Sequence, residues 1–585
     1  MPVSDLPFEV PRRLRAVVRT REISIVLIAG VIGVIAGLVV AAMGAAVNVL
    51  HAALFNLASG ERLSAVSAIE PLQALVPAAG GVGLGLGLFL LARWRPGGQV
   101  DPIEANALHG GRMSLRDSVV VALQTIWSSG VGASVGLEAG YTQLASGLAS
   151  WIGRMFHLRR NDLRLLVGCG AAAAIAGAFG APLAGTFYGF ELIIGSYTPL
   201  GLAPVGIAAL NGYLVAHAFA PTSLGIVPGS VNAVTGHDLV VAGVLGVAAA
   251  LFGIALMRGV ALWERLMIVL RIPMPVRPAI GGLIVGGLAL TTPQVLSSGH
   301  GALHVTAMME LPLTAIGMIL LFKAAASIVS LGSGFRGGLF FASLLLGALG
   351  GRLFADAINT VLPSAGLDPD IYAILGLGAL SASVIGGPLT MTFIVLENTS
   401  DFWLASTVLI AVIVANLLTR ELFGYSFATW RFHLRGEAIR GGIDVGWIRD
   451  LTVGRMMRPD VSTVPQDVSV DAFRKLYPLG STTRVVAVDG EGRYAGIVIV
   501  AEAHGVEDPK VNTIESLLRY RDVVLTPGMN VREAAATFDR AEAEALAVIE
   551  SPTRRHVVGL LTEAYVLRRY AEESERRRRE ALGER

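Results

Sequence analysis

The chain has 585 residues, of which 53% are hydrophobic and only 15% are charged. A soluble domain usually carries about 25% charged residues, and a soluble globule of this length could not bury so much apolar surface. These proportions argue against an ordinary soluble enzyme, and the net charge of +2 argues against a nucleic-acid partner. The single cysteine, Cys169, excludes an intramolecular disulfide framework and a cysteine-built metal site.

The N-terminal segment, residues 1–22, is mixed in character and rich in arginine. A long apolar stretch follows, about Ile23–Val49, without the cleavage pattern of a signal peptide. About 20 apolar residues suffice to cross a bilayer, so this stretch is predicted to be the first span of a membrane domain over 23–429. Arginines beside the first span place the N-terminus in the cytoplasm. We expect a multi-pass integral protein, and as its location the bacterial inner (plasma) membrane.

Further apolar segments continue to about Phe423. Several are too short or too glycine-rich for one clean crossing, and two are long enough to hold two short helices each. Broken helices at mid-membrane depth are tolerated only where they line an enclosed cavity, and they indicate a transport site. The segments are 74–93, 117–153, 164–194, 202–220, 237–258, 277–291, 309–331, 338–361, 371–396 and 403–423.

The character of the chain changes after Tyr425. Residues 430–446 read as a polar, basic linker, and 447–585 as a charged, cytoplasmic α/β region. Its four predicted strands occur in two pairs about 60 residues apart, so we predict two copies of one small unit, about 447–506 and 512–570. The strands are Val485–Val488, Gly496–Val500, Ala545–Ile549 and Val557–Leu561.

Two patterns recur within the membrane domain. The eight residues from Gly180, GAPLAGTF, and a glutamate four positions further on correspond to the eight from Gly386, GGPLTMTF, and their glutamate, at an offset of 206. The five residues from Gly136, GLEAG, correspond to the five from Gly338, GLFFA, at an offset of 202. The membrane domain is therefore predicted to consist of two related halves.

If each half has an odd number of spans, the halves are inverted and meet near the membrane midplane. Equivalent glycine-rich helix starts then converge from opposite sides. Each helix N-terminus offers unpaired N–H groups and a partial positive charge, so several such ends at one point can hold an anion.

These motifs, together with Gly424-Tyr425-Ser426 and the paired soluble units, resemble the CLC family of chloride channels and chloride/proton exchangers, and the trailing units resemble a pair of CBS domains. The resemblance covers nearly the whole chain. It implies an all-α polytopic membrane domain of two inverted repeats with broken helices, followed by a cytoplasmic α/β CBS pair. It also implies a homodimer in the lipid bilayer, with one anion pathway in each subunit.

The resemblance assigns roles to individual residues. Glu138 occupies the position of the family's gating glutamate, which blocks the outer anion site when charged and leaves it when protonated or displaced. Leu339 and Phe340 occupy the positions whose backbone N–H groups face the anion, and Tyr425 that of the tyrosine whose hydroxyl contacts it. A carboxylate inside a membrane segment is costly, which independently favours a functional role for Glu138.

The match is imperfect. Leu137 stands where the family has a basic residue, and Gln99 where it has an anion-contacting serine, with Asp101 nearby. A glutamine amide still offers two donors but is longer than a serine hydroxyl, so another small anion could replace chloride. Leu192 stands at the position of the inner proton-transfer glutamate; an alkyl group cannot relay protons. We therefore expect a channel-like protein with weak or no proton coupling, while Glu191 is interpreted as structural.

Alternatives remain open at this point. An anion/proton antiporter with a rerouted proton path is the nearest one, and a CLC-type carrier selective for another anion is the second. A cation or metabolite transporter would need acidic residues along the path, and an intramembrane enzyme would need a nucleophile–base pair or metal ligands. No cofactor is required. Thr562 lies where CBS domains often contact a ribose, so the pair either binds an adenine nucleotide or serves only as a dimer scaffold.

Overall fold

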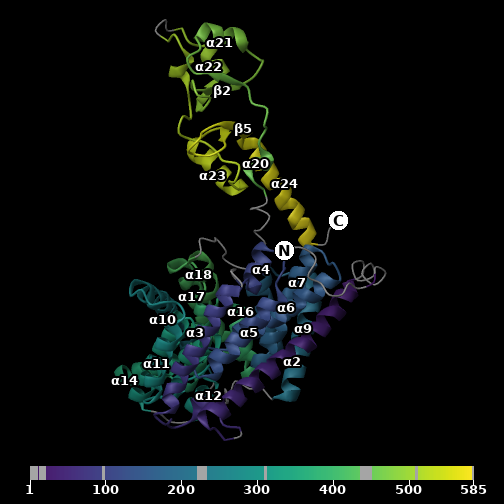
Figure 1. Ribbon diagram of the computed structural model, residues 1–585. Helices are drawn as coiled ribbons and strands as arrows, with labels where there is room; N and C mark the ends of the chain where they lie inside the picture. The colour runs from purple at the N-terminus through teal and green to yellow at the C-terminus, as the bar shows by residue number, and fades with distance from the viewer. Residues whose placement is uncertain are drawn as a thin grey trace. The chain divides into compact units, whose positions relative to one another are not determined.

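The structure is a computed structural model that describes residues 11, 22–58, 60–94, 99–220, 234–308, 312–434, 451–507 and 511–582. The chain divides into two compact units, Met1–Asp444 and Val445–Arg585, each described by itself below. The first unit is helical, and the described strands belong to the second (Figure 1). Most of the predicted N-terminal segment and of the linker over 430–446 lies outside the described residues.

Eight helices in the described part of the chain are long and apolar enough to cross a membrane. They are α2 (Glu22–Phe55), α3 (Val76–Trp94), α7 (Arg160–Phe179), α9 (Pro199–Phe219), α10 (Gly236–Val269), α13 (Leu313–Gly332), α14 (Phe340–Val361) and α17 (Phe402–Leu422). Shorter helices lie between and after them: α4 (Pro102–Leu108), α5 (Leu115–Gly130), α6 (Glu138–Met155), α8 (Pro182–Tyr188), α11 (Arg277–Ala289), α12 (His300–Met308), α15 (Pro369–Ile385), α16 (Pro388–Thr399) and α18 (Phe427–Leu434).

The prediction of divided segments is confirmed. The segment 117–153 holds α5 and α6, and 164–194 holds α7, α8 and a π-helical turn over Gly189–Ile194. Segment 371–396 is also divided, into α15 and α16, which we did not predict. The break is chemical in origin, because Gly386 ends α15 in a left-handed conformation (φ 88°) that other residues rarely adopt, and Pro388 begins α16.

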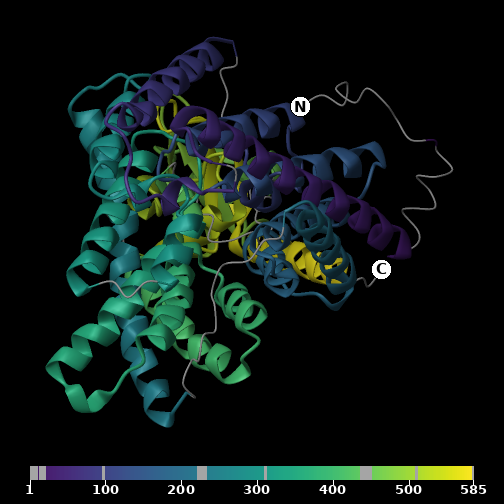
Figure 2. The same ribbon diagram turned by 90° about the horizontal axis from the view of Figure 1, so that it is seen from below.

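Helix α2 shows how the membrane unit divides its surface. Ile32, Ala36, Val40, Met43 and Val47 recur at helical spacing and are buried on one face. The opposite face carries exposed leucines and valines, as expected of a helix that meets lipid on one side. In Figure 2, α2 runs in purple beside the blue helices of the first half.

Small residues allow the helices of the first half to approach closely. A Cβ on Gly33 of α2 would lie 2.4 Å from the Ala208 carbonyl of α9, and one on Gly212 of α9 would lie 2.4 Å from the Ala173 carbonyl of α7. Lipid tails are as apolar as leucine, so close backbone packing replaces the hydrophobic effect as the force between such helices.

The two predicted halves are present as inverted repeats, α2–α9 and α10–α17. The first residues of α6 and α14 differ in number by 202, and so do the last residues of α5 and α13. The last residues of α7 and α15 differ in number by 206, and so do the first residues of α8 and α16. The offsets read from two short motifs therefore extend to whole helices.

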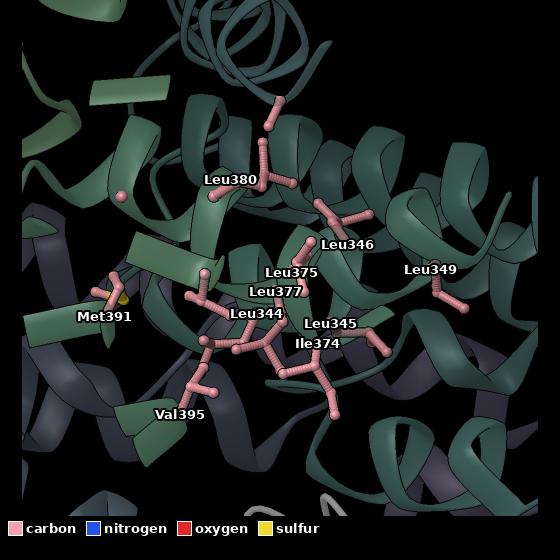
Figure 3. Packing of buried hydrophobic residues seen from close by; sticks show 14 of the residues in the cluster. Leu344, Leu345, Leu346, Leu349, Ile374, Leu375, Leu377, Leu380, Met391 and Val395 are labelled. Atoms are coloured by element: carbon pink, nitrogen blue, oxygen red, sulfur yellow. The ribbon is translucent and has the colours of Figure 1, made fainter. Parts of the chain in front are cut away.

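Helix α14 is held by a leucine-rich contact with α15 (Figure 3). At the crossing, a Cβ on Gly351 would lie 1.8 Å from the Tyr372 carbonyl, and one on Gly347 would lie 2.4 Å from the Gly376 carbonyl. This close packing fixes the axis of α14 and so the place where its N-terminus lies. The labelled side chains in Figure 3 are Leu344, Leu345, Leu346, Leu349, Ile374, Leu375, Leu377, Leu380, Met391 and Val395.

The second unit is the predicted pair of α/β copies. Strand β2 (Arg484–Val488) pairs antiparallel with β3 (Tyr494–Ile499), and β1 (Thr463–Pro465) pairs parallel with β2. In the other copy, β4 (Ala545–Ile549) pairs antiparallel with β5 (Val557–Thr562). Both antiparallel pairs have a register shift at the same place, before the last residue of the first strand. The helices are α20 (Val453–Met456), α21 (Val470–Leu476), α22 (Val500–His504), α23 (Val531–Ala541) and α24 (Glu563–Leu582).

Candidate functional site

The starts of helices α6 and α14 meet inside the membrane unit. Gly136 and Gly338, which are equivalent in the two repeats, form an antiparallel pair with N–H···O distances of 3.0 and 3.1 Å. Because each glycine donates to its counterpart, a local two-fold axis passes between them. The pairing brings two helix N-termini, with their unpaired N–H groups, to one place.

Glu138, the first residue of α6, lies on the N-terminus of α14. Its side chain is buried, and Oε1 accepts a hydrogen bond of 3.1 Å from the Phe341 backbone N–H. Its Oε2 is also buried and has no hydrogen-bond partner among the described residues. The acid of one half therefore occupies the anion-binding end of a helix from the other half, with one oxygen left unsatisfied.

Glycine leaves the space in which this carboxylate lies. A Cβ on Gly136 would lie 1.9 Å from Glu138 Oε2, and one on Gly338 would lie 3.1 Å from the same oxygen. Both glycines are thus needed where the side chain of Glu138 folds back over the paired backbone.

Leu339 and Phe340 lie beside Glu138, and both are buried. Leu339 is the N-cap residue of α14, and the Phe340 ring stacks on Phe179 with centroids 4.4 Å apart. The ring of Tyr188 lies 6.1 Å from that of Phe340. The structure therefore brings Glu138, Leu339 and Phe340 together.

Tyr425 lies in the segment between α17 and α18. Its ring centroid is 5.8 Å from that of Trp430. The adjacent Ser426 approaches the break between α15 and α16, since a Cβ on Gly386 would lie 3.0 Å from the Ser426 Cβ. Tyr425 is thus placed beside a broken helix.

Gln99 contacts an arginine that the sequence analysis missed. The Arg336 guanidinium (Nη2) donates to Gln99 Oε1 at 2.9 Å, and the Arg336 backbone N–H donates to Ser128 Oγ at 3.0 Å. The next residue, Val100, accepts at its carbonyl from the Gln143 side chain at 2.9 Å. In the sequence, Arg336 is recognisable only as a single arginine two residues before the GLFFA motif. Its contact with Gln99, which is distant in the chain, becomes visible only in the structure.

Glu191 and its repeat counterpart Glu397 cap each other's neighbouring helices. Glu191 accepts from the backbone N–H groups of Leu389 and Thr390, each at 2.9 Å. Glu397 accepts from those of Leu183 and Ala184, at 2.8 and 2.9 Å. These partners are also equivalent positions of the two repeats, so the contact obeys the same two-fold relation. Both carboxylates occupy helix N-termini, which agrees with the structural interpretation of Glu191.

Loss of either capping acid should weaken the fold by a similar amount. We expect Glu191→Gln and Glu397→Gln each to lower the free energy of unfolding by about 1.5–3 kcal/mol, the usual contribution of a hydrogen bond to a charged group. Denaturant unfolding in detergent, monitored by the circular dichroism signal of the helices, measures this free energy. The exposed Glu70→Gln is a control that should change nothing, and a large loss in only one of the two variants would contradict the symmetric arrangement.

Leu192 is buried in an apolar cluster with Ile103 and Ile193, against which Tyr188 packs. At that position there is no group that could take up or release a proton.

Within the described residues, no group of three or more histidine, cysteine or acidic side chains could hold a metal ion. Cys169 is buried in the small-residue packing of α7. Thr562 is the last residue of β5 and is half-buried.

Comparisons with known proteins agree on one family. A family model described as voltage gated chloride channel matches residues 80–420. A voltage-gated ClC-type chloride channel, ClcB, from Escherichia coli O81 (strain ED1a) is 31% identical over 405 residues, which cover 68% of this chain and 96% of that protein.

Two solved structures share the fold. A slow cyanobacterial Cl⁻/H⁺ antiporter is 22% identical, with a TM-score of 0.61, and the match covers 70% of this chain and 97% of that one. A eukaryotic CLC transporter is 19% identical, with a TM-score of 0.59, and the match covers 94% of this chain and 98% of that one.

Proposed function

The chain belongs to the family of voltage-gated chloride channels, and from this premise we propose that it carries chloride or a similar small anion across the membrane along a path gated by Glu138. The observation that carries the proposal is the position of the Glu138 carboxylate. It binds the N-terminal N–H of α14 while its second oxygen is buried without a partner. A mobile anion and this carboxylate would compete for the same N–H groups, so either can occupy the place but not both.

We propose that movement of Glu138 opens the path. Protonation removes the charge that holds the side chain on α14, and a competing anion displaces it. The N–H groups of α14 then bind the anion in place of the carboxylate, while the backbone stays in place. The gate therefore needs only a side-chain rotation out of the space that Gly136 and Gly338 leave for the carboxylate.

Proton coupling is proposed to be weak or absent, because the alkyl side chain of Leu192, buried in an apolar cluster, cannot relay a proton. One observation favours the alternative, an antiporter with a rerouted path. Tyr188 hydrogen-bonds the side chain of Thr142 and interacts electrostatically with Asp101 and Glu138. In this alternative, we propose that these groups carry the proton around Leu192.

The anion preference is proposed to depend on Gln99 and Arg336. Because Gln99 Oε1 accepts from Arg336, the amide NH₂ remains to face an anion, with a guanidinium behind it. This arrangement offsets the basic residue that Leu137 replaces. A planar guanidinium can bind oxyanions such as nitrate or bicarbonate in addition to chloride. The carrier could therefore select an anion other than chloride.

Removing Arg336 should reveal this contribution. We expect Arg336→Met to weaken anion binding about tenfold, in the range of one charge-assisted hydrogen bond, and to change the relative permeability of nitrate and chloride. Isothermal titration and bi-ionic flux in liposomes measure both. Arg277→Met removes another half-buried arginine and should leave both unchanged. Equal behaviour of the two variants would exclude Arg336 from the path.

For the second unit we propose a role as a scaffold for dimerisation. The alternative is that it binds an adenine nucleotide, with Thr562 contacting the ribose. The protein would be a homodimer of the bacterial inner membrane with both termini in the cytoplasm, and it would be a transporter and not an enzyme.

Liposome flux tests the function. Purified protein in vesicles with a chloride gradient should release chloride when valinomycin and potassium clamp the voltage, and empty vesicles should not. A reversal potential that follows the chloride gradient alone supports a channel. A shift when a proton gradient is added at constant chloride supports the antiporter. No flux of chloride, nitrate, fluoride or bicarbonate would refute the proposal.

A further inference from the structure

Lys323 is a charged side chain in the middle of a membrane span. It is the only charged residue of α13, and the sequence has no other lysine before Lys475. Its side chain is completely buried, at 0% exposure. A buried ammonium group is expensive in a membrane unless charge or hydrogen bonds compensate it, so its presence requires a physical reason.

The direct partners of Lys323 are neutral. Its Nζ donates to the carbonyl oxygens of Ser297 at 2.8 Å and Val295 at 3.1 Å. In the part of the chain that the structure describes, no carboxylate lies within 4.0 Å of it. Two carbonyl dipoles satisfy two of its three N–H groups but leave a full positive charge without a contacting counter-ion.

Hydrogen bonds place Lys323 against the segment that leads into Glu138. One turn further along α13, Ser327 Oγ lies 3.0 Å from Ser134 Oγ, and Ser330 Oγ accepts from the Ser134 N–H at 3.0 Å. Ser297, which binds Lys323 through its carbonyl, donates its N–H to the Gly132 carbonyl at 3.1 Å. The ammonium group is thus fixed from two sides to residues 132–134, just before Glu138.

A second connection runs through the start of α14. A Cβ on Gly299 would lie 3.5 Å from Lys323 Nζ, and the neighbouring His300 ring stacks on Phe341 with centroids 3.4 Å apart. Phe341 is the residue whose N–H binds Glu138. Glu138 and His300 both interact electrostatically with Lys323 through this region. Of these two titratable groups, Glu138 is the acid.

We propose that Lys323 is the fixed buried counter-charge of the outer anion site, a positioning residue that stabilises the Glu138 carboxylate and a transported anion alike. It touches neither, and acts through the electric field at one place that both occupy in turn. The inference rests on the proposed function and adds to it the positive charge that Leu137 lacks.

A shared counter-charge has an unusual consequence for binding. When Glu138 is ionised, loss of Lys323 weakens both competitors by similar factors, so the apparent affinity for the anion changes little. When Glu138 is replaced by glutamine, the anion alone depends on Lys323, and its affinity falls by the full factor. The effect of Lys323 should therefore depend on whether residue 138 carries a charge.

Chloride titration of four purified full-length proteins at pH 7.5 tests this: wild type, Lys323→Gln, Glu138→Gln and the double variant. We expect Lys323→Gln to change the apparent affinity less than about threefold in the wild type and to lower it about tenfold or more beside Glu138→Gln, within the usual range of coupling between neighbouring sites. Lys323→Arg keeps the charge and should behave as the wild type in both backgrounds.

The outcomes separate the two proposals. If Glu138→Gln alone leaves chloride binding and flux unchanged, the gate assignment fails. If Glu138→Gln tightens binding but Lys323→Gln has the same effect in both backgrounds, only the counter-charge proposal fails. We expect Lys323→Gln to fold, because glutamine retains a donor for the Ser297 carbonyl. If it does not fold, the same titration of Lys323→Arg decides the question. Loss of chloride binding in Lys323→Arg, which keeps the charge, would show that Lys323 has a structural role and would contradict the counter-charge proposal.

Discussion

Anion flux through Glu138→Gln should be faster than wild-type flux at neutral pH and should no longer vary with pH. The glutamine amide is uncharged at every pH, so it cannot compete with an anion for the Phe341 N–H as a carboxylate does. Removing a charge-assisted hydrogen bond of about 1.5–3 kcal/mol corresponds to roughly a ten- to hundredfold shift toward the anion-occupied state. In the wild type, flux should rise as the pH falls, because protonation of Glu138 makes the same change reversibly.

The measurement is chloride efflux from liposomes at several pH values between 5 and 8, under a voltage clamp with valinomycin. Glu104→Gln is the matched control, because Glu104 is another buried acid of the membrane unit but lies on α4, where it approaches His109. Its pH profile should equal that of the wild type. Flux through Glu138→Gln with the wild-type rate and pH profile would remove Glu138 from the gate.

Gly136→Ala should reproduce the effect of Glu138→Gln without altering Glu138. A methyl group at this position would lie 1.9 Å from Glu138 Oε2, well inside van der Waals contact, and the flexible carboxylate can move away more easily than the paired backbone. The displaced acid then loses its bond to α14, which again amounts to about 1.5–3 kcal/mol. We expect flux at neutral pH to rise about tenfold and its pH dependence to flatten.

Two further variants make this result specific. Gly350→Ala adds the same methyl group to α14, where nothing lies within 4 Å, and should leave flux unchanged. The double variant Gly136→Ala with Glu138→Gln should be no faster than either single variant, since both act on one contact. Additive effects, or loss of flux in Gly136→Ala with a native unfolding profile, would contradict the account.

Local patterns predicted the architecture well. Hydropathy located the membrane domain, and the two divided segments followed from their length. The repeat was found from eight residues at Gly180 and five at Gly136, because internal duplication preserves spacing that can be counted. The division of 371–396 was missed, although Gly386 and Pro388 carried the same chemistry as Gly180 and Pro182.

The polar contacts of the site were harder to predict. Gln99 by itself does not indicate a partner, because Arg336 lies 237 residues away in the chain. Lys323 lies within a predicted span, but a lone lysine in an apolar segment does not indicate which acid lies near it. Glu191 was interpreted as structural from the repeat, but its acceptance of two N–H groups from α16 depends on a helix that the sequence placed only roughly.

By itself, the sequence determined that this is a membrane protein of two related halves with a soluble α/β pair, since composition, hydrophobic length and repeat spacing are properties of the chain alone. The tertiary structure alone decided which helix start each acid meets: Glu138 lies on α14 and Glu191 on α16, each from the other half. The reason is physical. The two-fold packing of the halves brings together positions that are far apart in the chain, and no local pattern encodes where the axis between the two halves will lie.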